Sequence, residues 1–213
     1  HRFGQKALAF AVTHSIPHKN ISIEIHNSGG PFTLVPLPDN EGKPSSAIVW
    51  MENGENAKNL MEMETNSFER EMTVRSCNIL GPLKLVSKRT LWPIISQIAD
   101  RLYSQRLALI GETAHVVPPI GAQGLNMSLA DIKVLSDLDQ KYPDQLGSID
   151  TLKEYQKNRI FDIRQRVAGV SALNQISISS NKLVQNIRAF GLENFFQVPS
   201  IKHTTMKLGM GSR

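Results

Sequence analysis

The chain reads RLALIGETAHVVPPIGAQGLN from Arg106 to Asn126, and this stretch decides which fold the sequence predicts. It opens with a continuous apolar run that ends at Gly111, which is typical of a β-strand buried on both faces of a parallel sheet. A segment rich in proline and glycine follows. From Leu125 onward, apolar residues recur every three or four positions, as they do on one face of a helix. The stretch therefore predicts a strand, a loop and a helix in that order.

The predicted loop has the properties of a ligand site. Glu112 follows the strand, at the edge where open α/β sheets bind ligands and where a carboxylate can accept hydrogen bonds from ribose hydroxyls. Gly121 and Gly124 carry no side chain, so the backbone there can approach a flat ligand closely. The first turn of the helix offers free N–H groups and the positive end of its dipole to a negative charge. On these residues alone, a solvated carboxylate at a strand end is the other interpretation of Glu112.

The residues before this stretch predict an antiparallel meander, in which successive strands are neighbours. Four alternating or apolar runs are separated by short turns that contain proline, glycine or asparagine. A helical pattern covers residues 55–75, and an extended segment covers residues 83–94. The four predicted strands are Ala7–Val12, Ile21–Ile25, Phe32–Val35 and Ala47–Trp50.

The residues after it predict helices. One helix has a single buried face, marked by apolar residues at spacings of four, three, three and three. A long helix is predicted over residues 149–178 and a shorter one over 183–190, and residues 202–213 have the composition of a loose tail. The residues of the predicted buried face are Leu125, Leu129, Ile132, Leu135 and Leu138.

Composition limits the class of protein. The chain has 213 residues, of which 40% are hydrophobic and 20% charged, which fits one large or two small globular domains. Cys77 is the single cysteine, so an intrachain disulfide is excluded and a reducing, cytoplasmic compartment is expected. No apolar run is long enough to span a bilayer. His14, His18 and His26 do not predict a metal site, because Pro17 and a predicted turn separate the first two.

The charge distribution leaves two interpretations open. The net charge is +5, and residues 151–213 hold ten basic and three acidic side chains. This region is either a solvated face or a surface for peripheral attachment to an anionic inner membrane. We expect no nucleic-acid partner, because the chain has neither a recognition motif nor basic residues interleaved with aromatic ones.

The stretch from Gly111 resembles the second FAD-binding motif of the class A flavoprotein monooxygenases, usually written G-D-A-A-H-x-x-x-P-x-x-G-Q-G-x-N. Asp131, within the predicted helix, also suits this family. Other parts of the chain are similar to the ubiquinone-biosynthesis hydroxylase branch, including Gly30-Pro31-Phe32, Val49-Trp50 and Tyr155 with Arg159. Within the motif, the matching residues are Gly111, Ala114, His115, Pro119, Gly121 or Ala122, Gln123, Gly124 and Asn126.

This resemblance implies a mixed α+β or α/β fold in three regions: a substrate-binding, antiparallel-rich sheet over 1–104, the second half of an FAD-binding region over 105–147, and C-terminal helices over 148–213. It implies FAD as cofactor, NAD(P)H as reductant, molecular oxygen as co-substrate and a prenylated phenol as substrate. His115 is expected to be a packing or hydrogen-bonding residue, and no catalytic acid or base is assigned. The predicted cofactor-binding residues are Gly111, Glu112, Pro119, Gly121, Ala122, Gln123, Gly124, Leu125 and Asn126.

The same resemblance suggests that the wall of a substrate pocket comes from the sheet. Four aromatic or aliphatic side chains are candidates for it, although core packing is the alternative interpretation of the aromatic ones. The candidates are Phe32, Leu34, Trp50 and Trp92.

Two departures from the family pattern shape the functional prediction. Glu112 stands where the family has aspartate, which makes the carboxylate one methylene longer. The sequence also contains no G-x-G-x-x-G and no upstream Asp-Gly motif, on which the family relies to hold ADP and pyrophosphate. We therefore expect that the N-terminal dinucleotide-binding unit is absent and that this chain alone is inactive. The alternative is a non-catalytic remnant or accessory protein that binds a quinone precursor or a membrane complex.

Overall fold

The computed structural model describes residues 1–27 and 29–178, and these residues divide into two compact units. Residues 2–94 with 177–178 form the first, here called the sheet unit. His1 and residues 95–176 form the second, here called the helical unit. The predicted helix at 183–190 and the predicted tail at 202–213 lie outside the described residues.

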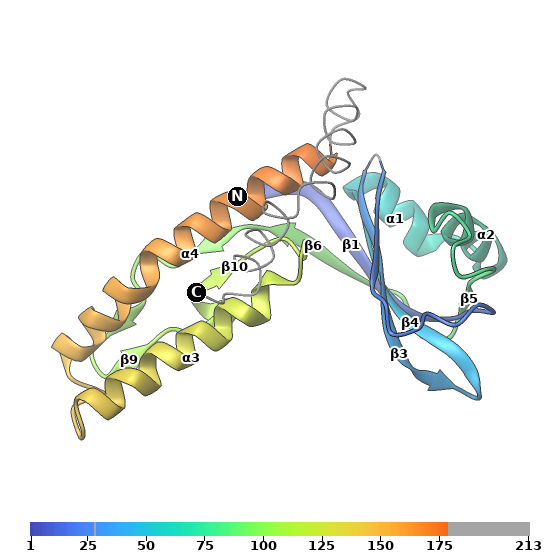
Figure 1. Cartoon of the computed structure of the whole chain (residues 1–213). Coiled ribbons are helices and arrows are strands. Elements are labelled where there is room, and N and C mark those ends of the chain that lie inside the picture. The colour runs from blue at the N-terminus through green and yellow to red at the C-terminus, as the bar shows by residue number, and fades with distance from the viewer. Residues whose placement is uncertain (28, 179–213) are drawn as a thin grey trace, which may run out of the picture. The chain divides into compact units, whose positions relative to one another are not determined.

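The sheet unit is a six-stranded sheet with two helices, α1 (Gly54–Glu62) and α2 (Thr65–Arg75), on one face (Figure 1). The strands follow the order β2-β3-β4-β1-β5, and β6 also pairs with β1. The fold is thus mixed, with an antiparallel-rich sheet, as the sequence predicted. The strands are β1 (Arg2–Thr13), β2 (Ile23–Asn27), β3 (Gly30–Asn40), β4 (Lys43–Asn53), β5 (Lys84–Leu85) and β6 (Thr90–Ile95).

The strand order corrects the predicted meander. Strands β2, β3 and β4 are successive antiparallel neighbours, but β1 pairs with β4, in a register that runs from Gln5 opposite Asn53 to Thr13 opposite Ser45. Glu41 and Gly42 form a two-residue turn with positive φ between β3 and β4, which suits a hairpin. The connection over residues 14–22 is too long for a tight hairpin, so the partner of β1 is not the next strand along the chain.

The core of the sheet unit lies between the sheet and the two helices. Alternate residues of each strand point to this face, as the pleat of a strand requires. The predicted helix over 55–75 is two helices, because Met63 is extended and the Glu64 carboxylate accepts hydrogen bonds from the backbone N–H groups of Asn66 and Ser67, which begins a new helix. The buried core residues are Leu8, Phe10, Val12, Phe32, Leu34, Ile48, Trp50, Ala57, Leu60, Phe68, Met72, Leu80 and Leu83.

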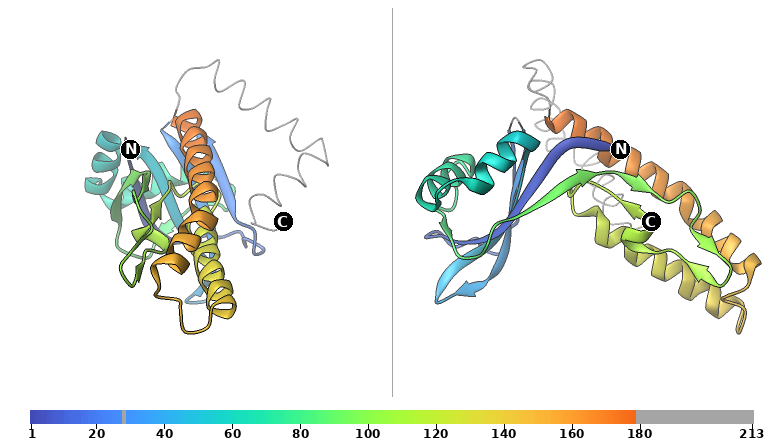
Figure 2. Two further views of the ribbon diagram at one scale, coloured as in Figure 1. Left: turned by 90° about the vertical axis from the view of Figure 1, so that its left-hand side faces the viewer. Right: turned by 180° about the vertical axis from the view of Figure 1, so that it is seen from behind.

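The helical unit is built on α3 (Gln123–Lys141) and α4 (Ile149–Ile178), with short strands beside them (Figure 2). The strands are β7 (Gln97–Ile98), β8 (Tyr103–Ser104), β9 (Leu107–Ala108) and β10 (His115–Val116), and Gly111–Thr113 form a 3₁₀ turn, η1. No helix of the described residues is both long and apolar enough to cross a membrane. The buried core residues are Leu102, Ala114, Met127, Leu138, Tyr155, Ile163 and Val167.

The prediction of a buried parallel strand before Gly111 is wrong for this chain. Only Leu107 and Ala108 are extended there, and they pair antiparallel with β8 across a turn at Arg106. Leu107 is 49% exposed and Ile110 is 38% exposed. Among the described residues, β9 has no partner besides β8, so the apolar run lacks the neighbours on both sides that a buried parallel strand needs.

The helix after the loop is confirmed, but its buried face is not the predicted one. Leu125, Leu129 and Ile132 are more than half exposed, whereas Leu138 is buried. Three residues fall short of a full 3.6-residue turn, so a run of three-residue steps drifts around the helix and does not stay on one side. The side of α3 that packs against the unit carries Met127, Asp131 and Leu138.

Candidate functional site

The segment from Gly111 to Gly124 is here called the glycine loop. Two of its glycines, one at its start and one near its end, have backbone conformations that favour glycine. Gly111 has φ of +57° and Gly121 has φ of +66°, and Ala122 follows with φ of +51°. A Cβ atom at Gly111 would also lie 3.2 Å from the Ser128 hydroxyl oxygen. Residues with side chains rarely adopt this conformation, so these two glycines fix the path of the loop between η1 and α3.

Exposure separates the residues of the glycine loop and the first turn of α3 into two sets. Most of those predicted to contact a cofactor are exposed, and Gly111 and Gln123 are half-buried. The other motif residues face the interior: Ala114, His115, Pro118, Ile120, Met127 and Asp131 are buried. The exposed set is Glu112, Pro119, Gly121, Ala122, Gly124, Leu125 and Asn126.

The N-terminus of α3 is open to a ligand. Ala122 occupies the capping position in the left-handed conformation, and its side chain makes no capping hydrogen bond to the helix. A Cβ atom built on Gly124 meets no atom within 4 Å. The first N–H groups of a helix have no partner inside the helix and carry the positive end of its dipole. This end of α3 therefore offers backbone donors and free space to a flat or negatively charged group.

A buried carboxylate fixes the start of the glycine loop. Asp131 is fully buried on α3, and one of its oxygens accepts hydrogen bonds from the Gly111 backbone N–H at 2.9 Å and from His115 Nε2, at 2.8 Å. The other oxygen accepts from Arg159 Nε, on α4, at 2.7 Å. The same guanidinium donates to the Met127 carbonyl oxygen at 3.2 Å. One carboxylate thus joins the loop, α3 and α4.

Hydrogen bonding keeps this carboxylate charged. Burial alone would raise the pKa of Asp131, but the hydrogen bonds from His115, Gly111 and Arg159 outweigh burial and hold the pKa below its usual range. Burial likewise opposes the charge on Arg159, yet Asp131 and Asp162 raise its pKa. The cluster is therefore an ion pair in which most of the available donors and acceptors are used, which is the condition for a buried pair to be tolerated.

Two further residues of this network were not found by sequence reasoning. Asp162 accepts hydrogen bonds from Arg159 at 2.7 Å and from Arg166 Nε at 2.9 Å, and Arg166 Nη1 donates to the Gln123 side-chain oxygen at 2.8 Å. The sequence signal for them is helical spacing: Asp162 lies three residues after Arg159 and four before Arg166, so the three side chains can pair on one face of α4. The same spacing is common on solvated helix surfaces, so it does not distinguish this network from ordinary surface pairs.

The structure places Glu112 and His115 differently. Glu112 is exposed and lies in η1, because β9 ends at Ala108 and does not deliver the carboxylate from a long strand. His115 is 3% exposed and is hydrogen-bonded to Asp131, so its position is that of a packing and hydrogen-bonding residue. Glu112 can therefore reach a ligand, whereas the His115 imidazole cannot do so without leaving its partner.

Three of the four candidates for a substrate wall lie in the closed core of the sheet unit. Phe32, Leu34 and Trp50 are at most 4% exposed and pack beneath α1 and α2. The Phe32 and Trp50 rings meet edge to face with centroids 5.4 Å apart. Trp92 is 60% exposed. The expected substrate wall therefore does not include Phe32, Leu34 and Trp50. Strand alternation turns these three side chains toward the helices and away from the other face of the sheet.

Replacing Phe32 by leucine distinguishes a core position from a ligand-binding one. We expect Phe32→Leu to lower the free energy of unfolding by about 1 kcal/mol, because the smaller side chain leaves the ring contact with Trp50 unfilled. Val35→Ala, at a 40% exposed position of the same strand, is the control and should cost less. Urea denaturation measures both. An unchanged stability of Phe32→Leu would contradict the core assignment.

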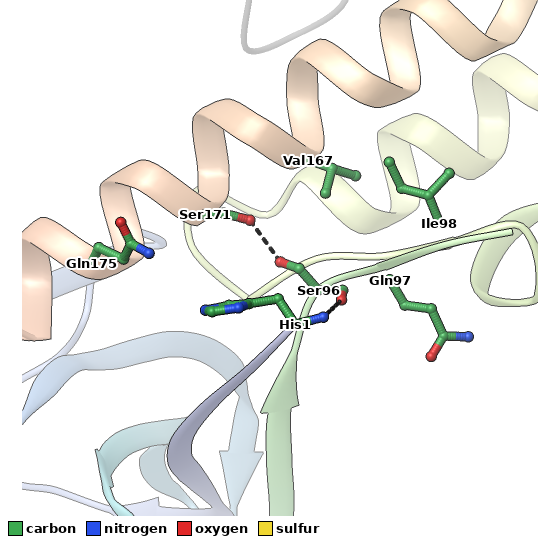
Figure 3. Close-up of a pocket in the computed structure, with 7 residues that line it drawn as sticks. All are labelled: His1, Ser96, Gln97, Ile98, Val167, Ser171 and Gln175. Carbon is green, nitrogen blue, oxygen red and sulfur yellow. Dashed lines mark hydrogen bonds between the residues drawn. The ribbon is translucent and has the colours of Figure 1, made fainter. Parts of the chain in front are cut away.

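A pocket of about 320 Å³ lies elsewhere in the helical unit (Figure 3). None of the predicted site residues lines it. Ser96 and Ser171 share a hydrogen bond of 2.7 Å across it, and the amino group of His1 donates to the Ser96 carbonyl oxygen. The lining residues are His1, Ser96, Gln97, Ile98, Val167, Ser171 and Gln175.

Comparison with known proteins agrees with the motif. A family model described as an FAD binding domain matches residues 3–168. The ubiquinone hydroxylase UbiL of Rhodospirillum rubrum is 28% identical over 213 residues, which cover 99% of this chain and 49% of that protein. The mitochondrial ubiquinone biosynthesis monooxygenase COQ6 of Danio rerio is 25% identical over 83% of this chain and 43% of its own length.

The fold has solved counterparts as well. The structure of Klebsiella pneumoniae HpxO, complexed with FAD and uric acid, aligns with a TM-score of 0.67 at 14% identity over 96% of this chain and 52% of that one. At this identity the likeness concerns the fold alone. The chain spans about half the length of the curated relatives it matches.

Proposed function

The chain belongs to the family of FAD binding domains, and from this premise we propose that it is part of a flavin-dependent monooxygenase that hydroxylates a prenylated phenol in ubiquinone biosynthesis. The single observation that carries the proposal is the glycine loop. It presents most of the predicted cofactor residues on the surface, beside a helix N-terminus whose capping residue is alanine, and a buried ion-pair network holds the start of the loop. The similarity to ubiquinone hydroxylases supports the substrate class.

The residues present fit FAD. Gly121 and Gly124 leave the backbone accessible, and the first N–H groups of α3 suit a negatively charged group. We assign the cofactor contacts to these groups and a ribose contact to Glu112, whose carboxylate is exposed. Bound FAD would supply the redox chemistry with oxygen, using NAD(P)H as reductant. The chain's own contribution is to orient the cofactor and to place N–H donors where negative charge develops.

The substrate contacts belong to the sheet unit in this proposal. With Phe32, Leu34 and Trp50 in the core, the face of the sheet away from α1 and α2 becomes the candidate wall. The centre of this face carries alanine, valine and threonine side chains, whose small size suits close approach of an aromatic ring. Exposed Trp92 remains a candidate contact from β6. The residues at the centre of this face are Ala9, Ala11, Thr33, Val35, Ala47 and Val49, with Ala7 and Met51 at one end.

Catalysis by this chain alone is expected to be absent. The sequence has no G-x-G-x-x-G to hold the ADP portion of FAD. Without this contact, we expect that the chain does not position FAD for reduction by NAD(P)H in the presence of substrate. We expect the purified chain with added FAD to show no substrate-dependent oxidation of NAD(P)H and no gain of an oxygen atom by the phenol in mass spectrometry. Substrate-dependent consumption of NAD(P)H would contradict this prediction.

Binding measurements separate the proposal from its alternative. Titration of the chain with a prenylated phenol, and with the same phenol lacking the prenyl chain, reports substrate recognition through tryptophan fluorescence. Recognition of the prenylated compound together with FAD binding supports the flavoprotein. Phenol binding without FAD binding favours the accessory protein that holds a quinone precursor.

Liposomes with and without anionic lipid test the proposed peripheral membrane attachment.

A further inference from the structure

An unbroken chain of hydrogen bonds joins the two ends of the glycine loop through α4. At the second glycine, the Gln123 side-chain amide donates to the Gly121 carbonyl oxygen at 3.1 Å and accepts from Arg166 at 2.8 Å. Arg166 donates to one oxygen of Asp162, and the other oxygen of Asp162 accepts from Arg159.

The chain closes at the first glycine of the loop. Arg159 donates to one oxygen of Asp131, and the other oxygen of Asp131 accepts from the Gly111 N–H. Five side chains therefore connect Gly121 with Gly111, the two glycines of the loop that have positive φ. The links vary little in length, from 2.7 to 3.1 Å, and all of these residues belong to the helical unit.

We propose that Arg159, Asp162 and Arg166 of α4 are positioning residues that hold the glycine loop in its cofactor-accepting conformation, with Arg166 and Gln123 fixing the Gly121 end. This inference rests on the proposed function, because it assigns the loop to FAD. It adds residues of α4 that lie outside the glycine motif and whose role is to act through Gln123 and Asp131. None of them needs to touch the cofactor.

The chemistry of the links favours positioning over simple packing. Arg166 divides one planar guanidinium between a carboxylate and an amide oxygen, so its fork geometry sets the distance between Asp162 and Gln123. Gln123 uses both ends of its amide, one toward Arg166 and one toward the Gly121 carbonyl. A change in Arg166 therefore reaches the backbone of the loop through the Gln123 side chain. The pair of Asp131 and Arg159 anchors the other end in the core, where both are nearly fully buried.

The test compares four variants of the full chain. Arg166→Met removes the link from Asp162 to Gln123, and Arg166→Lys keeps the charge but not the fork. Gln123→Glu keeps an acceptor for Arg166 but cannot donate to the Gly121 carbonyl. Arg164→Met is the matched control, because Arg164 lies on the same helix, carries the same charge and is exposed.

Two readouts keep the outcomes apart. The first is amide hydrogen exchange of the glycine loop in the chain without FAD, followed by the backbone N–H signals of Gly111, Gly121 and Ala122 in NMR spectra. The second is FAD affinity from flavin fluorescence. We expect Arg166→Met and Gln123→Glu each to speed exchange in the loop and weaken FAD binding about tenfold. Arg166→Lys should give values between those of these two variants and the original chain, while the thermal midpoints of all three test variants stay close to that of Arg164→Met.

The results decide between the two proposals. Unchanged exchange in Arg166→Met and Gln123→Glu would overturn the positioning role. A loss of thermal stability that matches the change in exchange would overturn it as well, because it would mean general destabilisation. If the variants show faster loop exchange but neither they nor the original chain bind FAD, the positioning role is supported and the proposed cofactor site is rejected. Failure of the positioning role is therefore distinguishable from failure of the proposed function.

Discussion

Replacing Asp131 by asparagine is expected to lower the free energy of unfolding of the helical unit by about 3 kcal/mol, the range found when one partner of a buried ion pair is removed. The amide removes the negative charge that faces Arg159 and cannot accept at both of its heavy atoms. Arg159 would then be left buried with one of its two carboxylate partners, the half-buried Asp162. Urea denaturation of the chain, followed by its helical circular dichroism signal, measures the loss.

Asp137 provides a matched control on the same helix. It is exposed and pairs with Lys133 at 2.8 Å, four residues away. Exposed pairs of this kind contribute little, so Asp137→Asn should change the free energy of unfolding by about 0.5 kcal/mol or less. Equal effects of Asp131→Asn and Asp137→Asn would contradict the view that the buried network holds the unit together.

The same network predicts the direction of the pH dependence. The pKa of Asp131 is lower in the folded chain than its ordinary value of 3.8, so its stabilising contribution is present above that value. It is lost as the pH falls through the lower, folded pKa. Asp162 has a lowered pKa for a similar reason and acts in the same direction. The stability difference between the original chain and Asp131→Asn should therefore be full at neutral pH and shrink below about pH 4. A difference that grows on acidification would contradict this assignment.

Replacing Gly124 by tryptophan is expected to weaken FAD binding about 100-fold, equivalent to about 2.7 kcal/mol. The Cβ position of Gly124 meets no neighbouring atom, so the chain should accept the large side chain without unfolding. The indole would then occupy the open space in front of the first turn of α3. Gly121 is less suitable for this test, because its φ of +66° makes any substitution strained.

Gly169→Trp is the control for this substitution. Gly169 lies on α4, is exposed, and its Cβ position is equally open. Both variants make the same chemical change on a helix of the same unit, so a difference in FAD affinity reports the location of the site. Isothermal titration provides the affinity, and circular dichroism checks that both variants keep their helices. Similar affinities in the two variants would place the flavin elsewhere.

The sequence predicted those elements whose signals are local. Gly111 and Gly121 mark a loop because of their backbone freedom, and residues 149–178 form the long helix that their apolar spacing predicted. The antiparallel pairing of β2, β3 and β4 also follows from alternation and short turns. These features depend on neighbours in the chain, which the sequence displays directly.

Features that depend on distant partners could not be predicted. The run before Gly111 has the composition of a buried strand, but burial requires neighbouring strands that the described residues do not supply. The five apolar residues between Leu125 and Leu138 lie on two faces of α3. Their three-residue spacings are compatible with either face, so the spacing alone does not show which one is buried. Phe32 and Trp50 could serve a core or a pocket until the helices were placed on their face of the sheet.

The site shows the same division between local and distant information. The exposed residues of the glycine loop follow from the motif. The support from Asp162 and Arg166 reaches the loop through the contact of Arg166 with Gln123, which lie 43 positions apart. Charged residues at helical spacing occur on most solvated helices, and no local pattern indicates that these two reach the loop.

Titration of the isotopically labelled chain with FAD, followed residue by residue in amide NMR spectra, tests the central claim most directly. If the glycine loop and the N-terminus of α3 hold the flavin, saturable changes will concentrate at the amides of residues 111–113 and 121–126. Spectra that stay unchanged at high FAD, or saturable changes confined to other parts of the chain, would contradict the account.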